Sequence, residues 1–305
     1  MRASWAYLCV IMIWSTTPLA IKFSNDSLAP LASISLRILL AVALVCVVFL
    51  ALRKALPLKR KHWRVYFAAA IGIFPNMPLV YVASEYIPSG LISILFGLTP
   101  FVNGLLAIPM LGEPKLPVSR WLALALALLG LWIVFSDQLA LGEDGYYGIV
   151  LMVLSVFTFC FSSMLIKRLG AKYSVEPMEQ AFGSMVFALP GLLGCWLMFD
   201  GDTNFHFSVE TVWALLYLSI IGSLFGFVAY FQILKSMSIA TVSLIPLMTP
   251  VLAVIWGGLL AGEQVSTSTL MGGGCILLAL GFYQGSFVFL WRRLVGRVGI
   301  LGRGS

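Results

Sequence analysis

Residues 90–113 read GLISILFGLTPFVNGLLAIPMLGE, and the same pattern returns 150 positions later, where residues 240–263 read ATVSLIPLMTPVLAVIWGGLLAGE. Each copy is an apolar stretch with a Thr-Pro pair near its middle and a Gly-Glu pair at its end. The identical pairs are Ser93 and Ser243, Thr99 and Thr249, Pro100 and Pro250, Gly112 and Gly262, and Glu113 and Glu263. Paired apolar segments interrupted by proline are typical of the binding site of a transporter built from two repeated halves.

The composition identifies an integral membrane protein. Of the 305 residues, 61% are hydrophobic and 10% are charged, and the mean hydropathy is +1.01. A soluble globular chain carries about 25% charged residues. The apolar runs reach the ~20 residues that a helix needs to cross a bilayer, so we expect an all-α membrane protein. The net charge of +7 does not indicate nucleic-acid binding, because the basic residues are concentrated in short loops.

We expect ten transmembrane helices, which we number as spans 1–10 in chain order. Their approximate limits are Ser4–Ile21, Leu31–Leu52, Arg64–Tyr86, Pro88–Leu111, Val118–Phe135, Tyr146–Ile166, Met178–Phe199, Thr211–Leu234, Ile239–Leu260 and Thr267–Leu290. The first run lacks a convincing cleavage site for a signal peptidase, so we interpret it as a retained span. None of the connections is long enough to hold a soluble domain.

The basic residues predict which side each loop faces. With the N-terminus placed inside the cell, the inner segments hold 17 of the 19 Lys and Arg residues, and the outer loops are dominated by Asp and Glu. Lys and Arg are enriched in cytoplasmic loops of membrane proteins. We therefore expect a multi-pass protein of the cell inner (plasma) membrane with both termini in the cytoplasm.

The repeat extends beyond the two opening segments. Further corresponding pairs are Trp63 and Trp213, Gly72 and Gly222, and Pro30 and Pro177. Spans 1–5 are therefore expected to repeat as spans 6–10, which divides the chain into two halves at residues 3–137 and 145–290. Because five is odd, the second half enters the membrane upside down, and a pseudo-twofold axis in the membrane plane relates the halves.

This plan resembles the EamA family of the drug/metabolite transporter superfamily over roughly residues 3–290. The residues that carry the resemblance are Trp14-Ser15, Ile21-Lys22, Arg37, Thr99-Pro100, Gly112-Glu113, Thr249-Pro250 and Gly262-Glu263. Ser15 stands where the family usually has Gly, and the second-half copy of the Trp motif is Phe159-Cys160. The resemblance implies an exporter of amino acids, their derivatives or other small metabolites.

Pro100 and Pro250 are expected to distort spans 4 and 9. Proline lacks an N–H and clashes with the preceding turn, and carbonyls freed in this way must face protein or a water-filled cavity. One interpretation is a central cavity lined by both spans. The other is a packing kink in which the Thr99 and Thr249 hydroxyls satisfy the backbone.

Other cavity candidates are polar or aromatic residues at membrane depth. They are Trp14 and Thr17 in span 1, Asn76 in span 3, Asn103 in span 4, and Tyr81 further out on span 3. Polar groups at this depth need partners, which a bundle interior or a substrate supplies. Packing in the core and hydrogen bonds between helices are the alternative roles. The predicted cavity lies between spans 1, 3, 4, 6, 8 and 9.

Three charged residues lie near the outer ends of the first spans. Arg37 is about two turns inside span 2, and Lys22 and Glu85 lie at a similar depth on spans 1 and 3. An embedded arginine pairs with an acid or faces water. We expect either an Arg37–Glu85 ion pair across the outer mouth, which breaks on opening, or an Arg37 side chain that extends outward to the interface.

The coupling mode stays open in the sequence. A proton-coupled transporter needs an acid within the membrane, and the nearest candidates, Glu85 and Glu179, both lie away from the midplane. Glu179 and Glu176 are expected to face the basic residues of 167–172 in a solvated inner rim. The chain carries no ATP-binding motif, so facilitated export and proton antiport, with protons as the coupling ion, are both compatible with it.

The favoured function is secondary transport by alternating access, with one half rocking against the other around a midplane site. Another small metabolite or a drug-like compound is the alternative substrate, in either direction. An intramembrane enzyme is the remote alternative, because His62 and His206 fall in loops and the five cysteines are scattered through apolar runs. We expect no cofactor and no metal site, and a monomer or weak homodimer in the lipid bilayer.

Overall fold

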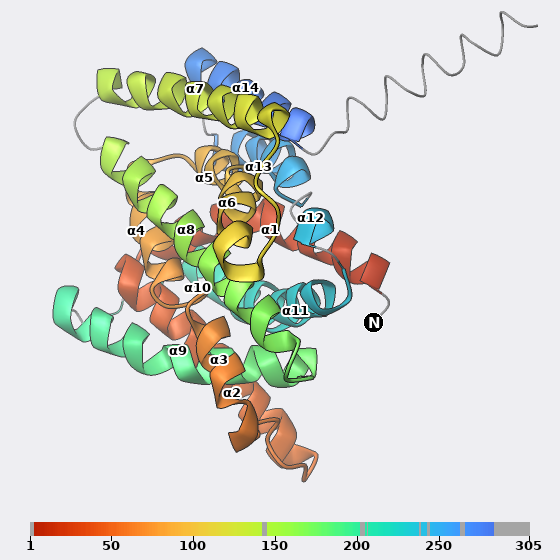
Figure 1. Cartoon of the computed structure of the whole chain (residues 1–305). Coiled ribbons are helices and arrows are strands. Elements are labelled where there is room, and N and C mark those ends of the chain that lie inside the picture. The colour runs from red at the N-terminus through yellow and green to blue at the C-terminus, as the bar shows by residue number, and fades with distance from the viewer. Residues whose placement is uncertain are drawn as a thin grey trace, which may run out of the picture.

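The computed structural model describes residues 3–141, 145–201, 205, 207–237, 239–242, 245–262 and 266–283 (Figure 1). The first half contains α1 (Ala3–Asn25), α2 (Pro30–Ala51), the 3₁₀ turn η1 (Arg60–His62), α3 (Trp63–Ala70), α4 (Asn76–Tyr86), α5 (Ser89–Phe96), α6 (Thr99–Leu111) and α7 (Val118–Leu141). The second half contains α8 (Gly145–Gly170), α9 (Pro177–Phe199), α10 (Val209–Tyr217), the π-helix η2 (Leu218–Phe225), α11 (Gly226–Ser236), α12 (Ile239–Val242), α13 (Ile245–Ala261) and α14 (Thr267–Tyr283).

These elements form the ten predicted spans. Spans 3 and 4 are each assembled from consecutive helical pieces, and span 8 changes to the π-helix η2 between α10 and α11. The described part of span 9 consists of α12 and α13. Within the described residues, six helical segments are long and apolar enough to cross a membrane, and shorter apolar helices account for others. The prediction of an all-α membrane protein is confirmed. The end of span 10 beyond Tyr283 lies outside the described residues.

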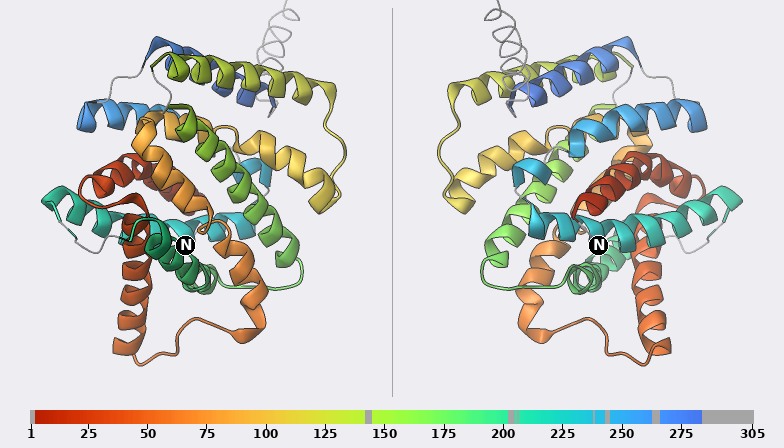
Figure 2. Two further views of the ribbon diagram at one scale, coloured as in Figure 1. Left: turned by 90° about the vertical axis from the view of Figure 1, so that its left-hand side faces the viewer. Right: turned by 90° about the vertical axis from the view of Figure 1, so that its right-hand side faces the viewer.

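Contacts between helices are equivalent in the two halves: a contact made by one half usually has a counterpart in which the two halves change places. Spans 2 and 7 (α2 and α9), 4 and 9 (α5 and α13), and 5 and 10 (α7 and α14) each contact their own counterpart. Other contacts come in exchanged pairs: α4 with α8 and α1 with α11, α3 with α9 and α2 with η2, and α6 with α8 and α1 with α13. Swapping the halves interconverts these pairs, which agrees with an inverted repeat. Figures 1 and 2 show the α7–α14 pair along one edge of the molecule.

Two glycines end corresponding helices in the same conformation. Gly112 follows α6 with φ 70°, and Gly262 follows α13 with φ 61°. This left-handed conformation is strained for residues with a Cβ and terminates helices efficiently. The Gly of each Gly-Glu pair therefore stops span 4 and span 9 at equivalent points.

Spans 3 and 8 break their helical pattern at equivalent depths but by different means. In span 3 the chain leaves α3 after Ala70 and resumes helix at Asn76, with Pro75 as the preceding residue. Proline cannot donate a backbone hydrogen bond and opposes a continuous helix. Span 8 has no proline here and widens into η2 instead, a form that is frequent at functional sites.

The α7–α14 contact depends on a glycine. A Cβ added at Gly130 of α7 would lie 2.5 Å from the Gly272 carbonyl oxygen and 2.9 Å from the Cys275 Cβ of α14. Small residues permit this kind of close approach between membrane helices. By contrast, a Cβ at Gly194 of α9 would meet no atom within 4 Å.

We predict that Gly130→Ala lowers the free energy of unfolding by about 1–3 kcal/mol, because the two helix backbones must separate. Gly194→Ala, the control for the same substitution in an open position, should leave stability unchanged or raise it slightly. Thermal unfolding of the purified protein in detergent measures both. Equal melting temperatures for the two variants would contradict the role given to Gly130.

Candidate functional site

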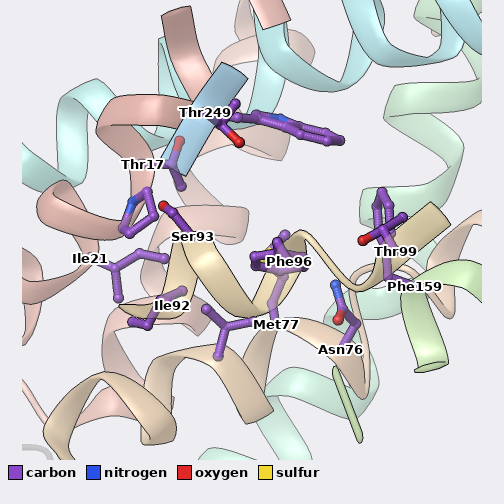
Figure 3. A pocket seen from close by; sticks show the side chains of 13 residues that line it. Thr17, Ile21, Asn76, Met77, Ile92, Ser93, Phe96, Thr99, Phe159 and Thr249 are labelled. Carbon is purple, nitrogen blue, oxygen red and sulfur yellow. The ribbon is translucent and has the colours of Figure 1, made fainter. Parts of the chain in front are cut away.

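A cavity lies between the two halves. Its walls come from α1, α4, α5, α6, α8 and α13, and the empty space between them is about 660 Å³, including the part open to solvent. The lining residues are Trp14, Thr17, Pro18, Ile21, Asn76, Met77, Val80, Ile92, Ser93, Phe96, Thr99, Phe159 and Thr249. Figure 3 shows Asn76 and Thr99 across the cavity from Thr17 and Thr249. Ligand pockets commonly combine apolar walls with a few polar groups in this way.

Five predicted site residues lie in this wall: Trp14, Thr17, Asn76, Thr99 and Thr249. They come from spans 1, 3, 4 and 9, four of the six spans named from the sequence. Their position in one cavity agrees with the sequence analysis, and substrate binding by them stays a prediction.

The polar groups in the wall differ in how they are satisfied. Asn76 donates to the Gly72 carbonyl (2.9 Å) and accepts from the Ser155 hydroxyl of α8 (2.6 Å), so its amide joins span 3 to span 6. Thr17 donates to the Ile13 carbonyl (2.7 Å). The buried Thr99 hydroxyl has no hydrogen-bond partner among the described residues. The Thr99 hydroxyl therefore keeps its capacity both to donate and to accept a hydrogen bond.

The helix break beside Thr99 precedes the proline. Residues 97 and 98 form a turn between α5 and α6, and Pro100 occupies the first turn of α6, where a missing N–H is tolerated. The predicted interruption of span 4 is thus present, in the turn that precedes Pro100. The backbone of α13 is helical through Pro250, and that proline's side chain lies outside the described part of the chain.

Asn103 lies one turn beyond Thr99 on α6 and is buried. It is not among the lining residues of this cavity. The structure therefore separates Asn103 from the five residues that share the wall.

An aromatic cluster borders the cavity and contains residues that the sequence analysis did not select. The rings of Trp14 and Phe159 are 5.7 Å apart in an edge contact, and Tyr230 lies 5.2 Å from Trp14 and 5.5 Å from Phe159. Tyr230 shares a hydrogen bond with the Ser163 hydroxyl (2.8 Å). Phe159 occupies the position that corresponds to Trp14 in the second half, and this correspondence is the sequence feature that could have found it.

A second cavity of about 490 Å³ shares Trp14, Thr17, Met77 and Phe159 with the first. Its remaining lining residues are Arg37, Ala69, Gly72, Ile73, Ser162, Ile166, Gly222, Phe227, Tyr230 and Phe231. It lies beside spans 2 and 8, so the two cavities together involve all six spans named from the sequence.

The expected Arg37–Glu85 pair is wrong. Arg37 is 1% exposed, and it donates to the Ser223 hydroxyl of η2 (2.8 Å) and the Tyr81 hydroxyl of α4 (3.2 Å). Glu85 is exposed near the end of α4 and accepts a hydrogen bond from Asn25 (3.0 Å). The outward-extending alternative is also wrong, because Arg37 points into the protein.

This arrangement gives Tyr81 a different place from the one predicted. Tyr81 is fully buried and contacts the Arg37 guanidinium instead of lining either cavity. Lys22 is half-buried near the end of α1.

Glu179 does not belong to a solvated rim. It is 4% exposed, and its two carboxylate oxygens accept from His62 Nδ1 (2.5 Å), the Tyr66 hydroxyl (2.5 Å) and Lys59 Nζ (2.9 Å). These partners come from the loop, η1 and α3 of the first half, whereas Glu179 belongs to α9 of the second. Lys167, one of the expected partners, donates instead to the Met237 carbonyl (2.7 Å).

The sequence analysis missed His62 and Tyr66 because each looked like an ordinary residue at the start of span 3. Their spacing, which places both near the inner end of one helix, was the available indication. The packing of α3 on α9 then brings them to Glu179 and buries all three side chains.

The duplicated helices and the cavity between the halves are features of a membrane transporter. Comparison with known proteins gives the same class. The chain belongs to the EamA-like transporter family, which matches residues 1–136 and 146–283. The family is part of the drug/metabolite transporter superfamily.

Named relatives cover nearly the whole chain. An uncharacterized transporter, YoaV, from Bacillus subtilis is 23% identical over 94% of this chain and 97% of its own. The uncharacterized inner membrane transporter YedA of Escherichia coli K12 is 24% identical over 90% of this chain and 88% of its own. A solved structure titled "Crystal structure of protein" shares the fold, with a TM-score of 0.67, 17% identity, and coverage of 93% of this chain and 97% of that one.

We predict that Glu179→Gln lowers the free energy of unfolding by about 1–3 kcal/mol, because three donors lose a charged acceptor in a buried position. Glu176→Gln is the matched control, since the Glu176 side chain is 76% exposed and lies 3.8 Å from Lys235. It should change stability by less than about 0.5 kcal/mol. Thermal unfolding in detergent compares them, and an equal response of the two variants would show that the Glu179 cluster does not stabilise the fold.

Proposed function

We propose that this transporter exports small metabolites such as amino acids or their derivatives, by alternating access around the central cavity. The observation that carries the proposal is that corresponding residues of the two halves, Thr99 and Thr249, line the same cavity. A cavity on the pseudo-twofold axis stays in place while the halves rock about it, which is how inverted-repeat transporters move a substrate.

The walls favour a small and partly apolar substrate. Aromatic and aliphatic side chains form most of the lining, and hydroxyl and amide groups supply a few polar contacts. Trp14 borders both cavities and offers a flat face on which an apolar group can pack.

Contacts between the halves on either side of the cavity support alternating access. Glu179 of α9 binds His62 and Tyr66, and Arg37 of α2 binds Ser223 of η2. The first contact joins α3 to α9 and the second joins α2 to η2. These two helix pairs are equivalent, because exchanging the halves converts one pair into the other. By the charge distribution of the loops, the Glu179 contact is on the cytoplasmic side and the Arg37 contact is nearer the outside. In this proposal the first separates when the cavity opens inward and the second when it opens outward.

The proposed placement in the plasma membrane with cytoplasmic termini rests on the same charge distribution and on the similarity to YedA, which is named as an inner membrane transporter. No acidic side chain is found among the described residues that line the two cavities. If transport is proton-coupled, Glu179 is the buried acid between the halves, and a pH gradient should then drive accumulation.

We predict that purified protein in proteoliposomes moves at least one class of radiolabelled amino acid, and that Trp14→Ala lowers the rate by about tenfold or more through loss of aromatic contact and cavity shape. The control is Trp213→Ala, because Trp213 is 69% exposed on α10. Both variants are first checked for wild-type melting behaviour.

The possible outcomes separate the parts of the proposal. Equal rates in the Trp14 and Trp213 variants would remove the cavity as the route. Movement without any response to an imposed pH gradient would exclude proton coupling. If folded wild-type protein moves no amino acid, the amino-acid class is wrong and other small metabolites become the substrates to test.

A further inference from the structure

The guanidinium of Arg37 is a buried charge without an acidic partner in the described part of the chain. The hydroxyls of Ser223 and Tyr81, which accept its hydrogen bonds, are both neutral. None of the ion pairs among the described residues includes Arg37. Burying a cation in this way is costly unless an anion or water compensates it, and ionisable residues inside a membrane protein mark functional positions.

Arg37 also borders the second cavity, where it is the only charged side chain among the described lining residues of either cavity. Its Nη2 atom lies against Gly222, where an added Cβ would be 3.1 Å away. The absence of a Cβ at Gly222 therefore lets the guanidinium pack closely against η2 at this point. A guanidinium has five N–H donors in a fixed planar fork, and the hydrogen bonds to Ser223 and Tyr81 use two of them.

The space in front of Arg37 is aromatic. Trp14, Phe159 and Tyr230 form one connected cluster of rings, and all three line the second cavity together with Arg37. Trp14 and Phe159 also line the first cavity, so the two cavities adjoin at these rings. The site thus offers one cation at one end and apolar faces over the rest.

We propose that Arg37 binds the carboxylate of the transported molecule and that Trp14, Phe159 and Tyr230 pack against its apolar part. The substrate class is a small molecule with one carboxylate, either an organic monoanion or an amino-acid zwitterion, and an aliphatic or aromatic body. A single guanidinium flanked by neutral hydroxyls balances one negative charge, so a dianionic phosphate is disfavoured. Ser223 and Tyr81 are positioning residues, because they orient the fork without neutralising it. This inference rests on the proposed transport function and names the chemistry of its substrate.

The test compares three radiolabelled probes of similar size: 3-phenylpropanoate, L-phenylalanine and 2-phenylethylamine. Binding to purified full-length protein in detergent is measured by scintillation proximity, and transport of the same probes is measured in proteoliposomes. Wild-type protein should bind the two carboxylates and bind 2-phenylethylamine at least tenfold more weakly. Arg37→Gln should weaken carboxylate binding by about tenfold to a hundredfold, as expected for loss of a charged hydrogen-bonded partner.

Two further variants and one control keep the test decisive. Arg37→Lys keeps the charge but loses the fork and should give an intermediate loss. Gly222→Ala places a methyl group beside Nη2 and should weaken carboxylate binding several-fold with all charges intact. Arg64→Gln removes an exposed arginine that lies over the Trp63 ring, and it should bind all probes as the wild type does.

The inference is overturned if folded Arg37→Gln protein binds carboxylates as tightly as the wild type, or if the wild type binds the amine as tightly as the acids. It is also overturned if the wild type binds none of the three probes. If the Arg37 variants do not fold, an unchanged affinity in Gly222→Ala overturns it. Transport of the amine or of other metabolites without dependence on Arg37 would contradict the carboxylate site and support the transport function. Carboxylate binding that depends on Arg37, without movement in proteoliposomes, would support the binding site and contradict the transport function.

Discussion

The interior of a bilayer offers no water to a backbone whose helix is interrupted, and this constraint governs the arrangement of the helices. Each freed N–H or C=O in lipid costs several kcal/mol, yet the chain interrupts its helix between α3 and α4 and between α5 and α6, and span 8 widens into η2. These irregular spans lie against helices of the opposite half as well as their own, with α4 and α6 on α8 and α11 on α1. The two halves therefore form one interleaved bundle around the central cavity.

The backbone follows the pseudo-twofold relation more closely than the charges do. Pro30 corresponds to Pro177, and the same offset places Ser184 of span 7 opposite Arg37 of span 2. Both side chains are buried. At this position one half thus has a cation at the second cavity, whereas the other has a neutral hydroxyl that donates to its own helix. Likewise, Glu179 of α9 accepts a hydrogen bond from α3, whereas the equivalent contact between α2 and η2 is made by an arginine. A symmetric frame with asymmetric charges can bind an asymmetric molecule in one orientation.

The sequence predicts the fold well because the fold depends on properties that can be read along the chain. The lengths of the apolar runs, the charges of the loops and the 150-residue repeat together predict ten spans in two inverted halves. Cavity residues on the pseudo-twofold axis, such as Thr99 and Thr249, were also predictable, because the repeat itself identifies them. The position of Glu179 was not predictable in the same way. Its burial depends on η1 and α3 packing against α9, more than 100 residues away.

The partner of Arg37 was also not predictable from the sequence. The depth of Arg37 within span 2 was predicted correctly, but depth along the membrane does not determine the face of the helix on which a side chain lies. The predicted partner was therefore wrong. Ser223 could be found only once η2 was known to pack against α2.

The interleaving of the halves also affects how the protein is made. Ribosomes deliver spans to the membrane in order, and α4 and α6 acquire their partner only when α8 follows. α5 waits for α13, and α7 waits for α14, which is the last helix in the described part of the chain. During synthesis the first five spans are therefore inserted with their partner surfaces uncovered. A ribosome that stalls near residue 145 would leave a fully inserted but unassembled half in the bilayer, a substrate for membrane quality control.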